Sequence, residues 1–108
     1  MTLNEYQQQA LDFDDVPADL SIIYPGLGIT GEAGEVADKI KKVFRDNDRN
    51  FTPEIKRAIA MEIGDVLWYC AKLAHDIGYS MDSIGNMNIG KLTDRRNRGV
   101  IQGSGDNR

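Results

Sequence analysis

Apolar residues recur every three or four positions through two long stretches of this chain, 25–45 and 53–77, which a short polar turn joins. This period is typical of helices that bury one face, and no stretch of useful length shows the alternation of a strand. The sequence therefore predicts an all-α fold in which the two long helices pair in antiparallel fashion. The expected core residues are Ile29, Ala33, Val36, Ala37, Ile40, Val43 and Phe44 in the first stretch and Ile55, Ile59, Ile63, Val66, Leu67, Cys70, Leu73, Ala74 and Ile77 in the second.

Capping residues and helix breakers predict a bundle of four helices. Thr2 begins a capping box, and Thr52 and Ser80 are placed to cap the third and fourth helices. Gly78 and Gly99 are placed to end those two helices. The expected helices run approximately from Leu3 to Phe13, from Pro25 to Arg45, from Pro53 to Ile77 and from Met81 to Arg98.

A chain of 108 residues has the size of one domain. Its hydrophobic and charged fractions, 41% and 28%, are ordinary for a folded protein, so we do not expect disorder of the whole chain. We expect residues 1–98 to form the helical domain and the Gly-rich residues 99–108 to form a flexible tail. Because so short a chain buries only a modest core, we expect a homodimer or homotetramer to enlarge it.

The single cysteine, Cys70, excludes an internal disulfide and a cysteine-based zinc site, which fits a reducing compartment. The first residues lack the basic and apolar segments of a signal peptide, and no apolar run approaches the roughly 20 residues that cross a membrane. We therefore expect a cytoplasmic protein without membrane contacts.

Charge is distributed unevenly. Residues 1–90 carry eight basic and 15 acidic residues, a balance of −7, whereas residues 91–108 carry five basic and two acidic residues, a balance of +3. So acidic a body makes a nucleic-acid polymer an unexpected partner, and the pattern suits a ligand that needs metal at one side and basic groups at the other. On charge alone, a basic last turn that complements the helix dipole explains the pattern equally well.

Two acidic pairs are the candidate chemical centre: Glu32 with Glu35, and Glu62 with Asp65. Residues three apart share a helix face, and antiparallel pairing of the two long helices would bring both pairs together. Four clustered carboxylates repel one another, and a hard cation such as Mg2+, or Mn2+ in its place, relieves that repulsion. We therefore predict that all four carboxylates are metal ligands and catalytic residues.

The alternative is that these residues are solvated surface acids paired with lysines, such as Lys39 four residues after Glu35. A single pair would favour that interpretation. Two pairs beside core stripes, with Gly34 and Gly64 inside them to let helices approach, favour the metal site instead.

The fourth predicted helix carries Asn88, Lys91 and Arg95 on one face, and Arg98 continues that line. Such side chains can neutralise phosphate oxygens, and arginine can bind two of them at once. We predict substrate binding for all four, with a solvated basic face as the alternative. Arg96 points elsewhere.

Trp68 lies one turn beyond Asp65 and could stack on a nucleobase, so we include it among the predicted substrate-binding residues. An aromatic residue at helical spacing is more often part of the core, and that alternative stays open. His75, the single histidine, and Cys70 are expected to be structural.

The chain resembles the MazG-like all-α nucleoside triphosphate pyrophosphohydrolases over nearly its whole length. The resemblance lies in the acidic signature, with 26 residues between its halves, and in three runs: Gly31 to Val36, Glu62 to Trp68, and Asn88 to Arg96. It implies Mg2+-dependent cleavage of a nucleoside triphosphate, expected to be a deoxynucleotide, between the α and β phosphates. It also implies a helical dimer or dimer of dimers with sites completed across an interface.

Three alternatives were weighed against this hypothesis. A phosphoribosyl-ATP pyrophosphohydrolase has a similar acidic site, but the region around Trp68 fits the MazG-like branch better. A non-catalytic helical dimer that binds a nucleotide or a partner gains nothing from clustered carboxylates. A ferritin-like di-iron protein needs two Glu-x-x-His motifs, and this chain has one histidine.

Overall fold

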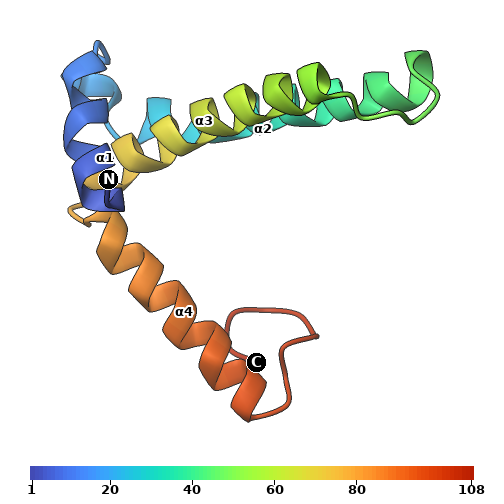
Figure 1. Ribbon diagram of the computed structural model, residues 1–108. Helices are drawn as coiled ribbons and strands as arrows, with labels where there is room; N and C mark the ends of the chain where they lie inside the picture. Colours follow the sequence, from blue (N-terminus) through green and yellow to red (C-terminus); the bar gives the residue numbers. More distant parts are fainter.

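The chain forms four α-helices and no strand, which confirms the all-α prediction. The computed structural model describes residues 1–108. In it, α2 and α3 lie side by side as an antiparallel hairpin, α1 packs at the base of that hairpin, and α4 leaves the base and points away (Figure 1). The helices span Leu3–Ala10 (α1), Ile23–Asp46 (α2), Pro53–Asp76 (α3) and Met81–Asn97 (α4), and short 3-10 turns cover Leu11–Phe13 and Ala18–Leu20.

The predicted caps are present at three helix starts. The hydroxyl oxygens of Thr2, Thr52 and Ser80 each accept a hydrogen bond from a backbone N–H three residues later, at 3.0, 3.2 and 3.2 Å. Gly78 and Gly99 follow α3 and α4 with φ angles of +86° and +72°, which L side chains rarely adopt. These local signals fixed the helix boundaries to within a few residues.

The start of α2 differs from the prediction. The helix begins at Ile23, so Pro25 occupies its first turn but not its first position. A proline is tolerated there because the first-turn N–H groups have no partner within the helix. The preceding residue, Ile22, has a φ of +68°, which costs a β-branched residue roughly 1–3 kcal/mol.

A buried glutamine of α1 joins the ends of α3 and α4. The Gln7 side-chain amide donates to the carbonyl oxygens of Ala71 and Tyr79 at 3.2 and 3.1 Å, and its own oxygen accepts from the backbone N–H of Met81 at 3.1 Å. Gln7 therefore ties the C-terminal part of α3 to the connection at Tyr79 and satisfies the first amide of α4. The small core lies around this joint and consists of Ala10, Ala71, Ala74 and Met81, with Tyr6, Leu67, Trp68 and Cys70 packed against it.

Much of the predicted core is exposed in a single chain. Of the expected residues only Val43 and Ala74 are buried, while Phe44 and Ile63 are each 54% exposed. The radius of gyration is 16.7 Å, against about 13 Å for a compact chain of this length. The accessible surface is 7730 Å², against about 6,000 Å² for a folded monomer of this mass. The stripes were correctly read as helical, but a two-helix hairpin covers only part of each helix.

No helix of the structure is both long enough and apolar enough to cross a membrane.

The predicted role of two glycines in helix approach is wrong for the single chain. A Cβ atom built at Gly34 or Gly64 has no neighbour within 4 Å, so neither glycine is needed for close contact with the other helix of the hairpin. The close approach is at Gly28 instead, where a Cβ would lie 2.4 Å from the ring of Tyr69. The ring of Tyr69 therefore rests on the backbone of α2 at a position that excludes any side chain.

Gly28→Ala is expected to lower the free energy of unfolding. Overpacking costs typically about 1–3 kcal/mol, which exceeds the gain of up to about 1 kcal/mol from replacing a helical glycine by alanine. Gly34→Ala is the matched control, with the same exchange in the same helix but open space around the new methyl group. Urea denaturation of both variants checks this, and equal midpoints would contradict the close approach.

Candidate functional site

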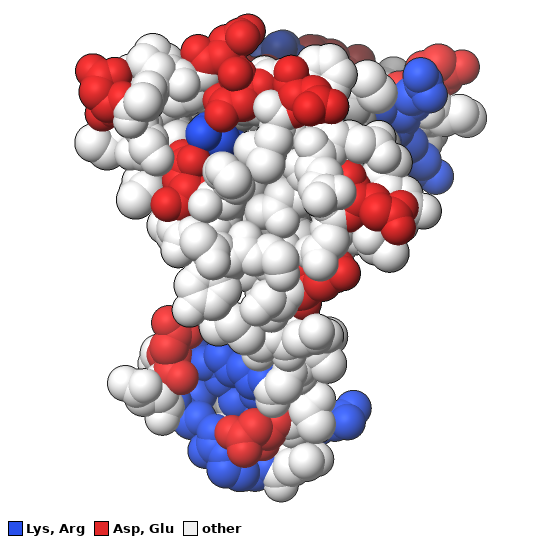
Figure 2. All heavy atoms as spheres, turned by 90° about the vertical axis from the view of Figure 1, so that its left-hand side faces the viewer, with Lys and Arg blue, Asp and Glu red and all other residues white.

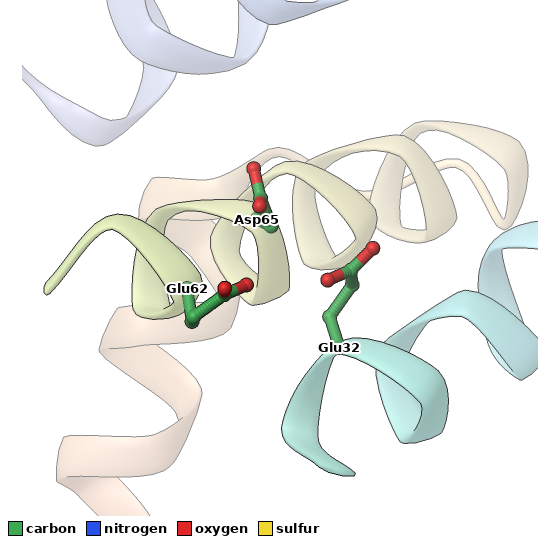
Figure 3. A group of neighbouring side chains, drawn as sticks. All are labelled: Glu32, Glu62 and Asp65. Carbon is green, nitrogen blue, oxygen red and sulfur yellow. The ribbon is translucent and has the colours of Figure 1, made fainter. Parts of the chain in front are cut away.

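Three of the four predicted carboxylates meet between α2 and α3. One oxygen from each of Glu32, Glu62 and Asp65 lies within 4.8 Å of the others. Glu32 projects from α2, and the other two project from successive turns of α3 toward the same region (Figure 3). The antiparallel pairing of the hairpin thus brings together residues 30 positions apart in sequence, which we call the acidic group.

The acidic group is electrostatically strained. The pKa of Glu32 is raised, first by partial loss of solvent and then by the charges of Asp65, Glu62 and Glu35. A lysine offsets part of the repulsion, since the Nζ atom of Lys39 lies 3.3 Å from Glu62. Three carboxylate oxygens in one place are the donors that hard divalent cations prefer, so the residues fit such an ion.

Glu35 lies outside the acidic group. It is exposed and forms no ion pair, although its charge acts on Glu32 one turn away. The lysine four residues later, Lys39, pairs with Glu62 across the hairpin and not with Glu35. The metal-ligand role of Glu35 stays a prediction.

An aromatic pocket of about 210 Å³ lies beside the acidic group. One wall of it is near the carboxylates because Trp68 and Tyr69 follow Asp65 by one turn of α3. Burial, then the phenol of Tyr24, and then the charges of Glu32 and Asp65 raise the pKa of Tyr69. The rings of Trp68 and Tyr69 meet edge to face with centroids 5.1 Å apart. The lining residues of this pocket, which we call the aromatic pocket, are Phe13, Asp15, Val16, Pro17, Tyr24, Trp68 and Tyr69.

Trp68 combines both interpretations considered for it. Its indole N–H donates to the backbone carbonyl of Ala10 at 2.9 Å, and its ring packs against the core. Another part of the same side chain lines the aromatic pocket. The substrate-binding role of Trp68 remains a prediction, supported by a fixed and partly open ring.

The tail folds back over the basic residues of α4. Its Asp106 carboxylate lies 3.7 Å from the Nζ atom of Lys91 and 3.5 Å from a guanidinium nitrogen of Arg95. The same Arg95 nitrogen donates to the carbonyl of Asp106 at 3.1 Å, while its Nε atom is buried without a partner. Arg98 pairs with Asp94 at 2.9 Å, and Asn88 is exposed. In this structure the carboxylate of Asp106 therefore pairs with Lys91 and Arg95, two of the predicted phosphate-binding residues.

The residues Asn88, Lys91, Arg95 and Arg98 of α4 are called the basic line below. The acidic group and the basic line lie in different parts of one chain. The C-terminal half of α4 points away from the hairpin (Figure 1). Lysine and arginine gather on the lower lobe in Figure 2, whereas acidic residues dominate the upper part. The two halves of the predicted site therefore do not meet within a single chain.

A buried ion network was missed by the sequence analysis. Lys72 is only 7% exposed, and its Nζ atom lies 2.7 Å from Asp14 and 2.8 Å from Asp76. The four-residue spacing of Lys72 and Asp76 on one helix was a visible signal for half of it. Asp14 approaches from the segment between α1 and α2, which no sequence period could place.

These features define a helical protein with three converging carboxylates beside a pocket that has aromatic walls. A family model described as the MazG nucleotide pyrophosphohydrolase domain matches residues 26–100. The chain is also 40% identical, over 112 aligned residues, to the Gene 37 protein of Mycobacterium phage L5, with 91% of this chain and 98% of the phage protein covered. No solved structure gives a significant match. The chain therefore belongs to the MazG nucleotide pyrophosphohydrolase family, which confirms the resemblance seen in the sequence.

Family membership gives the acidic group a context. Members of this family typically depend on a divalent metal, and the acidic group is the place in this chain where three oxygen ligands converge.

Mg2+ or Mn2+ is expected to raise the melting temperature at neutral pH. Because partial loss of solvent and then the neighbouring carboxylates raise the pKa of Glu32, the folded chain binds that proton more tightly than the unfolded chain does. Stability from this group is thus present at low pH and is lost as the pH rises through the raised pKa. A cation that offsets the repulsion should stabilise the fold by about 2.7 kcal/mol at roughly 100 times its Kd, and protons should abolish the effect in acid.

Differential scanning fluorimetry with and without metal measures this increment. Asp65→Asn should lose it, whereas Glu54→Gln, which removes a charge from α3 far from the acidic group, should keep it. An equal increment in both variants would place the cation elsewhere.

Proposed function

We propose that this protein hydrolyses nucleoside triphosphates, including deoxynucleotides, between the α and β phosphates, with release of a nucleoside monophosphate and pyrophosphate. The observation that carries the proposal is the acidic group beside the aromatic pocket. Membership of the MazG family supports the reaction class. A nucleoside triphosphate has phosphate oxygens for a cation held by the acidic group and a base for the aromatic pocket, so one ligand would use both sites.

Glu32, Glu62 and Asp65 would hold Mg2+, with Mn2+ as a substitute. When bound, the ion neutralises phosphate charge and lowers the pKa of water that can attack phosphorus. These carboxylates would hold the ion between α2 and α3, and Trp68 and Tyr69, which line the neighbouring pocket, would orient the base. Lys39, whose Nζ atom lies 3.3 Å from Oε1 of Glu62, would compete with the ion for this carboxylate.

Glu35 is the residue that we assign to proton transfer. It lies one helical turn from Glu32 but outside the acidic group, so its carboxylate is not needed to complete the three-oxygen cluster. A carboxylate without an ion pair, one turn from the acidic group, would be free to accept the proton of the attacking water.

A second copy of the chain is proposed to supply the basic residues. The exposed apolar surface and the excess radius of gyration support association, and α4 points away from its own hairpin. In a symmetric dimer, α4 of one copy would bring Lys91, Arg95 and Asn88 to the acidic group of the other. The triphosphate must then displace Asp106 from Lys91 and Arg95.

Pyrophosphate release from a panel of nucleoside triphosphates tests the activity. The wild type with Mg2+ should turn over at least one of them. Glu35→Gln should lower kcat by about 100-fold or more, the usual range for loss of a general base. It should also retain the metal-induced rise in melting temperature. Binding of nucleotide without pyrophosphate release by the wild type would contradict the proposed activity.

Mixing two inactive variants tests the shared site. Asp65→Asn damages the acidic group and Lys91→Ala damages the basic line, so each homodimer should be inactive. If subunits exchange, half of the dimers are mixed and hold one intact site, which restores about a quarter of wild-type activity. Exchange is verified with differently tagged subunits. No recovery in verified mixed dimers would show that each site belongs to one chain.

A further inference from the structure

The buried ion network of Lys72 has no role in the proposed chemistry, yet it lies behind the aromatic pocket. Lys72, Asp14 and Asp76 have side chains that are 9%, 22% and 4% exposed, respectively. Burying charges is costly unless they are paired with good geometry, and both pairs here are shorter than 3 Å. Apolar side chains at these three positions would avoid the cost of burying charge, so the network must serve a purpose that apolar packing would not.

The network fixes both ends of one segment. At its beginning, the second carboxylate oxygen of Asp14 accepts from the backbone N–H of Val16 at 3.0 Å. At its end, the second oxygen of Asp76 accepts from the backbone N–H of Ile22 at 3.0 Å. Lys72 ties Asp14 to α3, and Asp76, which is itself on α3, bonds Ile22 directly while pairing with the same lysine, so the segment 14–22 is held to α3 at two points.

The backbone at the second anchor is in an unfavourable conformation. Ile22 has a φ of +68° although it is β-branched and half exposed. Such a conformation persists only where the surroundings determine it. Two hydrogen bonds hold it: the Ile22 N–H donates to Asp76, and the N–H of Ile23, where α2 begins, donates to the carbonyl of Ser21 at 2.7 Å and closes a tight turn around Ile22.

The segment held in this way forms the outer wall of the aromatic pocket. Asp15, Val16 and Pro17 lie between the two anchors, and Tyr24 follows the second anchor by two residues. The opposite wall, Trp68 and Tyr69, is on α3 one turn before Lys72. The distance between the walls therefore depends on the ion network more directly than on the apolar core.

We propose that the Asp14–Lys72–Asp76 network positions the outer wall of the aromatic pocket and so sets how tightly a nucleobase binds. The inference rests on the proposed function in one respect, namely that the pocket receives the base. Lys72 is a positioning residue here and touches no substrate. Hydrogen bonds from Lys72 and Val16 hold the pKa of Asp14 below its ordinary value, which keeps this carboxylate charged at neutral pH.

Asp14→Ala is the informative change because it frees the wall while leaving the Lys72–Asp76 pair in place. Asp19→Ala is the matched control, since it removes an aspartate from the same segment that has no ion pair and does not line the pocket. Asp14→Asn keeps one of the two acceptor oxygens, for either Lys72 or Val16, and it provides the test if Asp14→Ala fails to fold.

Fluorescence of Trp68, the single tryptophan, reports base binding without any need for catalysis. Titration with the four common nucleosides should quench it in the wild type and in Asp19→Ala. In Asp14→Ala the nucleoside Kd should rise by about tenfold, with a smaller rise in Asp14→Asn. Binding of inorganic tripolyphosphate with Mg2+, measured by calorimetry, should be unchanged in all three variants, which a general loss of structure would not allow.

Equal nucleoside affinity in Asp14→Ala and Asp19→Ala would overturn the proposal, as would a parallel loss of nucleoside and tripolyphosphate binding. Absence of any nucleoside response in the folded wild type would overturn it too. If base binding depends on Asp14 but no pyrophosphate is released from any nucleotide, the inference stands and the proposed activity fails.

Discussion

The antiparallel contact between α2 and α3 is the interaction on which the site depends. It places Glu32 opposite Glu62 and Asp65, although three carboxylates in one place raise the pKa of Glu32 and oppose the pairing. The contact is closest where the ring of Tyr69 lies on the backbone of Gly28. The same contact that assembles the carboxylates therefore sets one wall of the aromatic pocket. Packing energy holds together charges that would otherwise separate, and this makes the acidic group receptive to a cation.

The hairpin alone is an incomplete structure. A two-helix layer leaves one side of each helix uncovered, and the small core around Gln7 lies at one end of the molecule. Large apolar side chains such as Leu27 and Met61, at 71% and 61% exposed, have no partner within the chain. The same incompleteness appears in function, because the basic residues of α4 lie away from the acidic group. A second copy would address both deficits at once.

Local sequence signals accounted for most of the fold. Thr2, Thr52 and Ser80 cap helices because their side-chain oxygens bond to amides three residues on, which needs no distant contact. The signals were weaker where the chain depends on tertiary contacts. Ile22 has a positive φ in a tight turn whose N–H is accepted by Asp76, more than 50 residues later, and no local pattern indicates this contact. Gly34 and Gly64 illustrate the opposite error, since proximity to a core stripe in sequence did not mean contact with the other helix.

The sequence by itself determined the helices, their antiparallel pairing and the identity of the acidic residues, because helical periodicity and spacing are local properties of the chain. It also carried the family membership that residues 26–100 show. Only the tertiary structure decided that Glu35 lies apart from the other three carboxylates, that Asp106 covers Lys91 and Arg95, and that Lys72 is buried between two aspartates. Those facts depend on how elements distant in sequence meet. The free energy of these tertiary contacts comes from packing and desolvation, which a pattern of residues along the chain does not specify.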